Sequence, residues 1–322
     1  YVSLRVLTHY DILKLKWFYI SASFFVIFLC IDIFIQYFFL KDILGNVPIT
    51  ERRMSGFFGD ELIAGGYIQR LSFFAIFLPF ILNTKKNLNK YLIFFIIIIL
   101  IFGVILSGNK MPFFLFLLSL SLFCILNVNL RKKFLILFLF AILFLSLIYK
   151  TNTNFKNDIG RFYNTAVNVI NVFTSKSNPL EGNKNMLNAP YILEFYGAYI
   201  TWKKNIFFGG GIKSFRYNCP NCNSHPHNYY LEFFVDLGLL GFFIVSFFLF
   251  CVFSKIYKLR HIFNFNSMLD YKTFTFFIIF FIEFFPIRSS GSFFSTGNAA
   301  FIFLILALLV SLMEKSEHKR IS

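Results

Sequence analysis

Residues 91–106 read YLIFFIIIILIFGVIL, a run without a charged side chain. A run of this kind is close to the length that a helix needs to cross the hydrocarbon core of a bilayer. Similar runs recur along the whole chain, so its 322 residues are 57% hydrophobic and only 14% charged. A soluble domain has about 25% charged residues. The composition therefore excludes an ordinary soluble protein, a disordered one and a fibrous one, and it predicts an all-α, polytopic membrane helical bundle.

The apolar runs predict about eight transmembrane helices within a single membrane domain covering residues 1–322, because no internal repeat or linker is visible. Several runs are near the lower limit of roughly 17 residues, so we expect their ends to extend into flanking polar residues. The predicted spans are residues 17–40, 66–82, 91–107, 111–126, 134–149, 229–254, 273–287 and 299–313.

Basic residues orient these spans. A net charge of +16 would suggest nucleic acid as a partner of a soluble protein, but here topology accounts for about half of the basic residues. With eight spans, five basic groups lie on one side of the membrane, and the positive-inside rule makes that side cytoplasmic. Both termini are then cytoplasmic. The groups are Arg5/Lys14/Lys16, Lys85/Lys86/Lys90, Arg131/Lys132/Lys133, Lys255/Lys258/Arg260/Lys272 and Lys315/Lys319/Arg320.

The opposite face carries one large loop, residues 151–228. A loop this long in a compact protein is usually functional or disordered, and two stretches favour order. Phe162, Ala166, Ile170 and Phe173 follow helical spacing, and Pro190 opens a second, aromatic-rich helix that ends near Trp202. We expect both short helices to lie in the membrane interface, where Trp and Tyr are favoured.

The most informative stretch of the loop is its end, residues 224–232, which read SHPHNYYLE. Pro226 favours the first turn of a helix, which places His225 near the N-cap and His227 in the first turn. The partial positive charge of a helix N-terminus favours a neutral imidazole and attracts phosphate. His227 is therefore a candidate general base beside an anionic substrate. The alternative is a solvated histidine at the membrane interface.

Polar side chains continue along the helix that follows. Asn228, Glu232 and Asp236 recur every four residues, on one face. Acids inside a span are costly and are functional candidates, although pairing with a neighbouring arginine to lock helices together is the alternative. Glu283 has the same two interpretations, with Arg288 as a possible partner.

Basic residues on the outer face form a second candidate set that topology does not explain. Several of them converging would make a diphosphate clamp, because arginine pairs phosphate oxygens in a bidentate way. The alternative is that each extends to a lipid headgroup. The set comprises Arg52, Arg53, Arg70, Lys110, Arg161, Arg216 and Arg288.

Two further motifs lie in the large loop. The Gly209–Gly211 run is a weak phosphate signal, and a flexible turn is the default interpretation. Cys219, Cys222, His225 and His227 have the ligand types of a zinc site, but they lie too close together in the sequence to chelate readily. A local disulfide between Cys219 and Cys222 is favoured on an oxidising face, and no metal is expected.

These residues resemble the O-antigen ligase and O-antigen polymerase superfamily of bacterial envelope enzymes, over about residues 52–301. The best motif is His227-Asn228-x-x-Leu231-Glu232 followed by Gly238-Leu239-Leu240-Gly241, at the end of the large loop. The other similar segments are Arg53…Ser55-Gly56…Asp60, Ser107-Gly108-Asn109-Lys110, Phe207-Phe208-Gly209-Gly210-Gly211 and Pro286…Gly291-Ser292-Phe293-Phe294.

The resemblance implies an inverting glycosyltransferase of the bacterial inner membrane, with its active face in the periplasm and with no cofactor. The donor would be a glycan linked to undecaprenyl diphosphate, and the acceptor would be lipid A-core, for an O-antigen ligase, or another glycan, for an O-antigen polymerase. The lipid bilayer is the remaining partner, and nucleic acid is not one. The competing hypotheses are a lipid-linked sugar transporter and a non-catalytic scaffold of envelope assembly.

The resemblance also implies residue roles. His227 would activate the acceptor hydroxyl, with Asn228 or Glu232 orienting the histidine or the acceptor. The diphosphate would be bound by the cations Arg53, Arg70, Lys110, Arg216 and Arg288. Two departures from the family pattern stand out. Lys110 occupies a position where arginine is usual, and eight spans are fewer than the family's ten or more, so we expect further helices before Tyr1.

Overall fold

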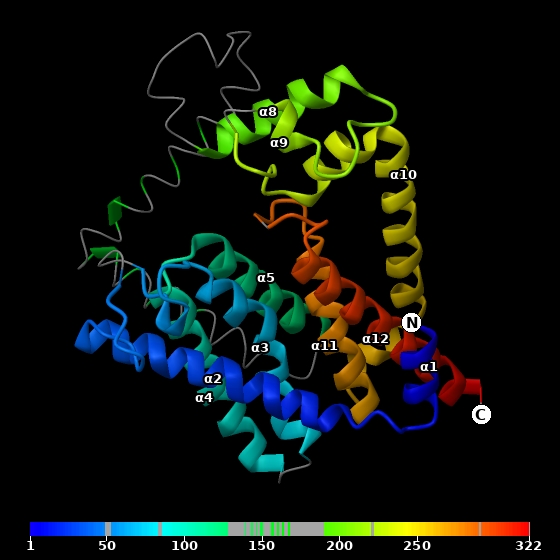
Figure 1. Cartoon of the computed structure of the whole chain (residues 1–322). Coiled ribbons are helices and arrows are strands. Elements are labelled where there is room, and N and C mark those ends of the chain that lie inside the picture. The colour runs from blue at the N-terminus through cyan, green and yellow to red at the C-terminus, as the bar shows by residue number, and fades with distance from the viewer. Residues whose placement is uncertain are drawn as a thin grey trace. The chain divides into compact units, whose positions relative to one another are not determined.

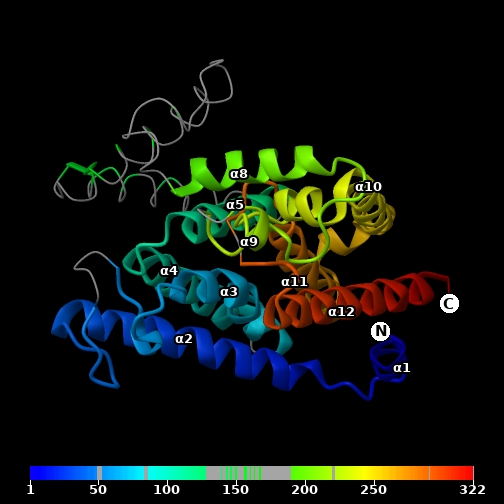
Figure 2. The same ribbon diagram turned by 45° about the horizontal axis from the view of Figure 1, so that its top comes forward.

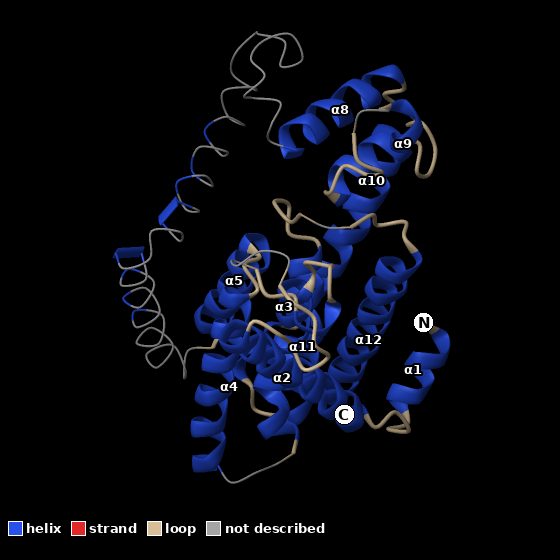
Figure 3. Cartoon of the chain, turned by 60° about the vertical axis from the view of Figure 1, so that its left-hand side comes forward, coloured by secondary structure: helices blue, strands red, loops and turns tan. Residues whose placement is uncertain are grey.

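The structure is a computed structural model, and it describes residues 1–48, 53–82, 86–127, 190–219, 222–289 and 291–321, with isolated residues between 139 and 167. Every regular element in these ranges is helical (Figure 3). In chain order the elements are α1 (Val2–His9), α2 (Leu15–Phe39), η1 (Gly56–Phe58), α3 (Ala64–Ile81), α4 (Lys86–Leu106), α5 (Lys110–Leu126), α8 (Pro190–Lys204), α9 (Phe215–Asn218), α10 (Tyr229–Lys258), η2 (Arg260–Asn264), α11 (Met268–Glu283) and α12 (Thr296–Ile321).

The helices agree with seven of the eight predicted spans. The remaining span, 134–149, lies largely outside the described residues, as does the helical spacing at 162–173. Four helices are long and apolar enough to cross a membrane: Leu15–Phe39, Ala64–Ile81, Tyr229–Lys258 and Thr296–His318. Tyr91–Leu106 and Lys110–Leu126 are shorter apolar helices. The expected helical membrane protein is confirmed, while the count of eight spans and the periplasmic loop stay predictions.

The chain divides into two compact units. Unit 1 comprises Tyr1–Val128, Val252–Arg288 and Ala300–Ser322, and unit 2 comprises Asn129–Cys251 and Ser289–Ala299. The boundaries fall inside α10 and α12, so each of these helices contributes residues to both units.

Helix α3 is the centre of unit 1. It packs against α2, α4, α5 and α11, an arrangement that can be followed in Figure 2. Its largest buried side chains are phenylalanines. Phe77 meets Phe123 of α5 with ring centroids 5.2 Å apart, and Phe123 meets Phe274 of α11 at 5.5 Å. Such ring pairs contribute about 0.5–1.5 kcal/mol each beyond their buried area. Much of the phenylalanine excess in this unit therefore builds the core.

The two ends of the chain meet in unit 1, where α1 lies beside the end of α12 (Figure 1). Arg5 forms an ion pair with Glu314 at 2.7 Å, and the ammonium of Lys315 donates to the carbonyl of Thr8 at 3.0 Å. Exposed ion pairs contribute little energy, so these contacts mainly report proximity. The placement of both termini on the cytoplasmic side of the membrane stays a prediction.

Unit 2 is built around a buried stripe of α8. Glu194, Ala198 and Thr201 recur at helical spacing and are all buried. Ala198 packs with Phe215 of α9 and Val235 of α10 in a small core, which Trp202, Leu231, Cys219 and Cys222 partly cover. The second predicted helix of the loop is thus confirmed, and this packing positions the candidate site.

Candidate functional site

Helix α10 begins at Tyr229, three residues later than the start at Pro226 that the sequence predicts. The side-chain oxygen of Asn228 accepts hydrogen bonds from the amides of Tyr230 and Leu231, at 3.0 and 3.3 Å. Asparagine is a strong N-cap residue, and it caps the helix here in preference to the expected start near Pro226. The expectation that His227 lies in the first turn is therefore wrong: His227 directly precedes the cap.

The backbone of His227 is unusual. Its φ is 49°, in the left-handed region that residues other than glycine rarely adopt. Holding such a conformation costs on the order of 1–3 kcal/mol, and outliers of this kind cluster at functional sites. Asn228 fixes the backbone that follows His227. The side chain of His227 is one-third exposed. A partly accessible imidazole is thus held in a defined place.

A buried carboxylate faces this imidazole. Oε1 of Glu194 lies 3.7 Å from Nε2 of His227, and only 2% of the Glu194 side chain is exposed. The side-chain amide of Asn223 donates to the same oxygen, and the ring of His225 lies 4.2 Å from the ring of His227. Burial raises the pKa of Glu194, while the contacts with His227 and Asn223 partly lower it. The site therefore contains an acid–imidazole pair.

Sequence reasoning missed Glu194. The residue is one of the few acids of the large loop, and it lies in the helix predicted from Pro190. The signal in the sequence is its helical spacing with Ala198 and Thr201. The thirty-three residues that separate it from His227 conceal the contact, because nothing in the local pattern specifies which segment packs on α8.

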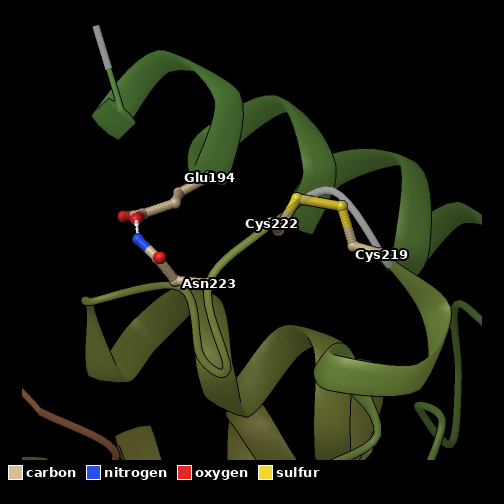
Figure 4. The surroundings of a disulfide bond; sticks show 4 residues. All are labelled: Glu194, Cys219, Cys222 and Asn223. Carbon is tan, nitrogen blue, oxygen red and sulfur yellow. Dashed lines mark hydrogen bonds between the residues drawn. A yellow bond between two sulfur atoms is a disulfide. The ribbon is translucent and has the colours of Figure 1, made fainter.

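A disulfide joins Cys219 and Cys222, as the sequence favours, and it packs on α8 near Glu194 (Figure 4). A Cβ atom at Gly197 would lie 2.5 Å from the sulfur of Cys222 and 2.8 Å from that of Cys219. Glycine is thus needed for this close approach, one helical turn after Glu194. Asn223 follows Cys222 directly, so the packing of the disulfide on Gly197 also places Asn223 beside Glu194. Among the described residues no group of three or more His, Cys, Asp or Glu side chains could hold a metal ion.

Replacing Gly197 by alanine is expected to push the disulfide away from α8, because a Cβ atom there would lie too close to both sulfur atoms. We expect a loss of stability of about 1–3 kcal/mol, as in other overpacked cores. Thermal unfolding in detergent measures this effect. Gly66→Ala is the matched control, since a Cβ atom there meets nothing within 4 Å. Equal melting temperatures for the two variants would contradict the contact.

Glu232 binds the segment that follows α11. Its buried carboxylate accepts hydrogen bonds from the hydroxyl of Ser292 and, at 2.6 Å, from the amide of Phe293. Asn298 in turn donates to the carbonyl of Ser292 at 3.1 Å. Both oxygens of Glu232 thus hold residues 291–299 on α10. The sequence suggests an arginine as the structural partner of this acid, and it does not anticipate Ser292 or Phe293.

The glycine-rich turn docks into a break in α10. Gly238 has φ 66° and ψ −167°, a non-helical conformation inside the helix. The carbonyls of Val235 and Asp236 accept instead from the amides of Gly210 and Gly211, at 2.8 and 3.0 Å. The amides of Leu239 and Leu240 donate to the carbonyls of Ile206 and Phe207, at 2.9 and 3.2 Å. We call these residues, 206–211 and 235–240, the glycine joint.

The side chain of Asp236 completes the glycine joint. It accepts from the amide of Lys213 at 2.7 Å and from the hydroxyl of Ser214 at 3.1 Å. The acid is 1% exposed, so these bonds satisfy a carboxylate that would otherwise be costly to bury. The Gly209–Gly211 run is therefore a structural turn that fastens α9 to α10.

In unit 1, two of the predicted cations share one acid. The carboxylate of Glu283 receives Arg70 at 2.8 Å and Arg288 at 3.0 Å. Glu283 and Arg288 are buried, and Arg70 is partly exposed and lies over the ring of Phe301, 5.1 Å from its centroid. The suggested pairing of Glu283 with Arg288 is confirmed. Two guanidinium groups against one carboxylate leave an excess of one positive charge.

Three further cations of the predicted set, Arg53, Lys110 and Arg216, are described and are exposed. In unit 1, the amide of Met54 donates to the carbonyl of Leu106 at 3.1 Å, which places the segment of Arg53 beside the turn that leads to Lys110. In unit 2, Arg216 lies on α9. Arg52 and Arg161 lie outside the described residues.

The candidate residues are thus divided between the units. Unit 1 holds Arg53, Arg70, Lys110 and Arg288, and it brings Arg70 and Arg288 together. Unit 2 holds His227, Asn228, Glu232 and Arg216, and it adds Glu194 to His227.

Comparison with known families gives one match. Residues 95–246, just under half of the chain, match the family model described as O-antigen ligase. The matched range includes Lys110, Arg216, Glu194, His227 and the glycine joint. No curated protein and no solved structure matches the chain significantly.

Proposed function

We propose that the chain, whose residues 95–246 match the O-antigen ligase family, is a membrane glycosyltransferase that moves a glycan from undecaprenyl diphosphate onto an acceptor hydroxyl at the periplasmic face. O-antigen ligation to lipid A-core is the reaction we favour. The observation that carries the proposal is the placement of a partly exposed imidazole, His227, against the buried carboxylate of Glu194, within the family-matched region.

The proposed reaction is a single displacement with inversion. His227 takes the proton of the acceptor hydroxyl as its oxygen attacks the anomeric carbon. The bond from that carbon to the diphosphate oxygen breaks, and the diphosphate leaves with the bonding electrons. Asn228 supports the reaction by fixing the backbone next to His227, and Glu232 does so by holding residues 291–299.

Cations are proposed to bind the diphosphate and to stabilise it as negative charge develops. Arg70 and Arg288 are held in place by Glu283 and still supply excess positive charge. Arginine can pair two phosphate oxygens at once, whereas Lys110 offers a point charge. Arg53 and Arg216, both exposed, are assigned the same role.

The decisive experiment identifies the acceptor of the glycan. The chain, with any natural N-terminal extension, is expressed in a Gram-negative strain that makes O-antigen repeats but lacks its own ligase and polymerase. The lipopolysaccharide and the lipid-linked pool are then separated on gels, with membrane-inserted His227→Ala as the inactive control. A repeat attached to lipid A-core supports ligation. Longer chains that stay on undecaprenyl diphosphate identify a polymerase instead.

The transferase proposal fails if neither pool changes although the protein is in the membrane. A narrow sugar preference is excluded by repeating the assay with the repeat unit of the native host. A change in the transbilayer distribution of the lipid-linked sugar, without a new glycosidic bond, would identify a transporter.

A further inference from the structure

We propose that Glu194 is a positioning residue for His227: it holds the Nε2–H of the imidazole and so leaves Nδ1 as the atom that receives the acceptor proton. This inference rests on the proposed function of His227. It names an acid that lies outside the His227–Glu232 motif and belongs to a different helix, α8.

The atoms that face each other favour one tautomer of His227. Nε2 of His227 lies 3.7 Å from Oε1 of Glu194, which is an ion-pair distance and is longer than a hydrogen bond. A carboxylate is an acceptor only, so it favours the ring form that carries its proton on Nε2. Nδ1 then presents its lone pair elsewhere, and catalytic contacts of this kind often tighten when substrate binds.

The surroundings of Glu194 hold the carboxylate in place. Its side chain is 2% exposed, and the amide of Asn223 donates to Oε1. Gly197 lies one turn after Glu194 on α8, and the disulfide that packs on Gly197 fixes the loop carrying Asn223. Burying an acid costs free energy, and a hydrophobic residue at this position of the stripe would pack on the core without that cost. The acid is therefore explained by what it does to His227.

The other polar groups around the pair leave this role to Glu194. His225 contacts the ring of His227 at 4.2 Å, and its Nδ1 lies 3.0 Å from the hydroxyl of Ser224. On α10, Glu232 is engaged by Ser292 and Phe293, and Asp236 by Lys213 and Ser214. Of the three acids Glu194, Glu232 and Asp236, Glu194 is the one whose carboxylate faces the imidazole of His227.

The proposal gives the proton a defined path. The acceptor hydroxyl transfers its proton to Nδ1 while its oxygen forms the glycosidic bond. The resulting imidazolium keeps its Nε2–H toward the carboxylate, whose negative charge stabilises it. The proton on Nδ1 then passes to solvent or to the departing diphosphate, which restores the neutral ring.

The test variant is Glu194→Gln, which keeps the size of the side chain and removes its charge. We expect kcat to fall about 10- to 100-fold, a part of what general-base catalysis supplies, with KM nearly unchanged. Glu194→Asp should recover part of the rate. Glu61→Gln, at an exposed acid of unit 1, is the matched control.

A spectroscopic readout separates this inference from the proposed function. Nitrogen-15 NMR of histidine-labelled protein reports the proton position on His227, whose signals are assigned by their loss in His227→Gln. We expect the Nε2–H form in the wild type and a mixture of both forms in Glu194→Gln. Unchanged signals and an unchanged kcat in Glu194→Gln overturn the inference while His227→Ala is still inactive. Full activity of His227→Ala overturns the proposed function itself.

Discussion

Replacing His227 by alanine is expected to lower the rate of glycan transfer by about 10²- to 10⁴-fold, the range that a positioned general base contributes. The acceptor hydroxyl then has to lose its proton to water while the diphosphate departs. Substrate binding should change much less, because the cations assigned to the diphosphate are intact. The measurement is the initial rate of product formation in membranes with matched protein levels, at several acceptor concentrations.

The matched control for this variant is His261→Ala. The ring of His261 also contacts a polar side chain, the hydroxyl of Ser316 at 3.1 Å, but His261 lies in η2, within unit 1 and outside the family-matched residues. We expect it to keep near-normal activity. If both histidine variants were equally active, the non-catalytic scaffold would become the better explanation. If both were equally inactive with normal insertion, the loss could not be assigned to proton transfer.

The sequence predicts the features that depend on residues close together in the chain. The helices of unit 1 come directly from apolar runs such as 91–106, because a bilayer requires a long apolar segment whatever packs against it. The local disulfide also follows from sequence, since Cys219 and Cys222 are three residues apart. The pairing of Glu283 with Arg288 spans only five residues, and the sequence suggests it for that reason.

Long-range contacts could not be predicted in this way. Glu194 meets His227, and Ser292 meets Glu232, across segments whose packing no local pattern specifies. The start of α10 differs from the prediction for another reason. Pro226 and Asn228 are both helix-start residues, and the hydrogen bonds of the Asn228 side chain decide between them.

Replacing Gly238 by alanine is expected to destabilise unit 2 by about 3 kcal/mol or more. With φ 66° and ψ −167°, Gly238 occupies a region that is essentially restricted to glycine. A Cβ atom would also lie 2.5 Å from the amide nitrogen of Gly209. Adjustment must therefore separate the two segments of the glycine joint and break its four backbone hydrogen bonds. Buried groups left unpaired cost about 1–3 kcal/mol each.

Thermal unfolding in detergent measures this effect, and we expect the midpoint to fall on the order of 10 °C. Gly297→Ala is the control within unit 2, since a Cβ atom at Gly297 meets nothing within 4 Å and its φ is not positive. We expect that variant to melt within a degree or two of the wild type. A normal melting curve for Gly238→Ala would mean that α10 tolerates the side chain and that the glycine joint is not a close contact.

A double-substitution cycle tests whether the two glycine motifs act as one unit. Gly209 has φ 70°, and a Cβ atom there would lie 2.5 Å from the carbonyl carbon of Asp236, so Gly209→Ala should also open the glycine joint. Once one substitution has separated the segments, the second has less contact left to disrupt. We therefore expect the double variant to lose clearly less stability than the two single losses combined, since contacting sites are not additive. Additive losses would show that each glycine only serves its own turn, and the hydrogen bonds across the glycine joint would then contribute little to holding α9 on α10.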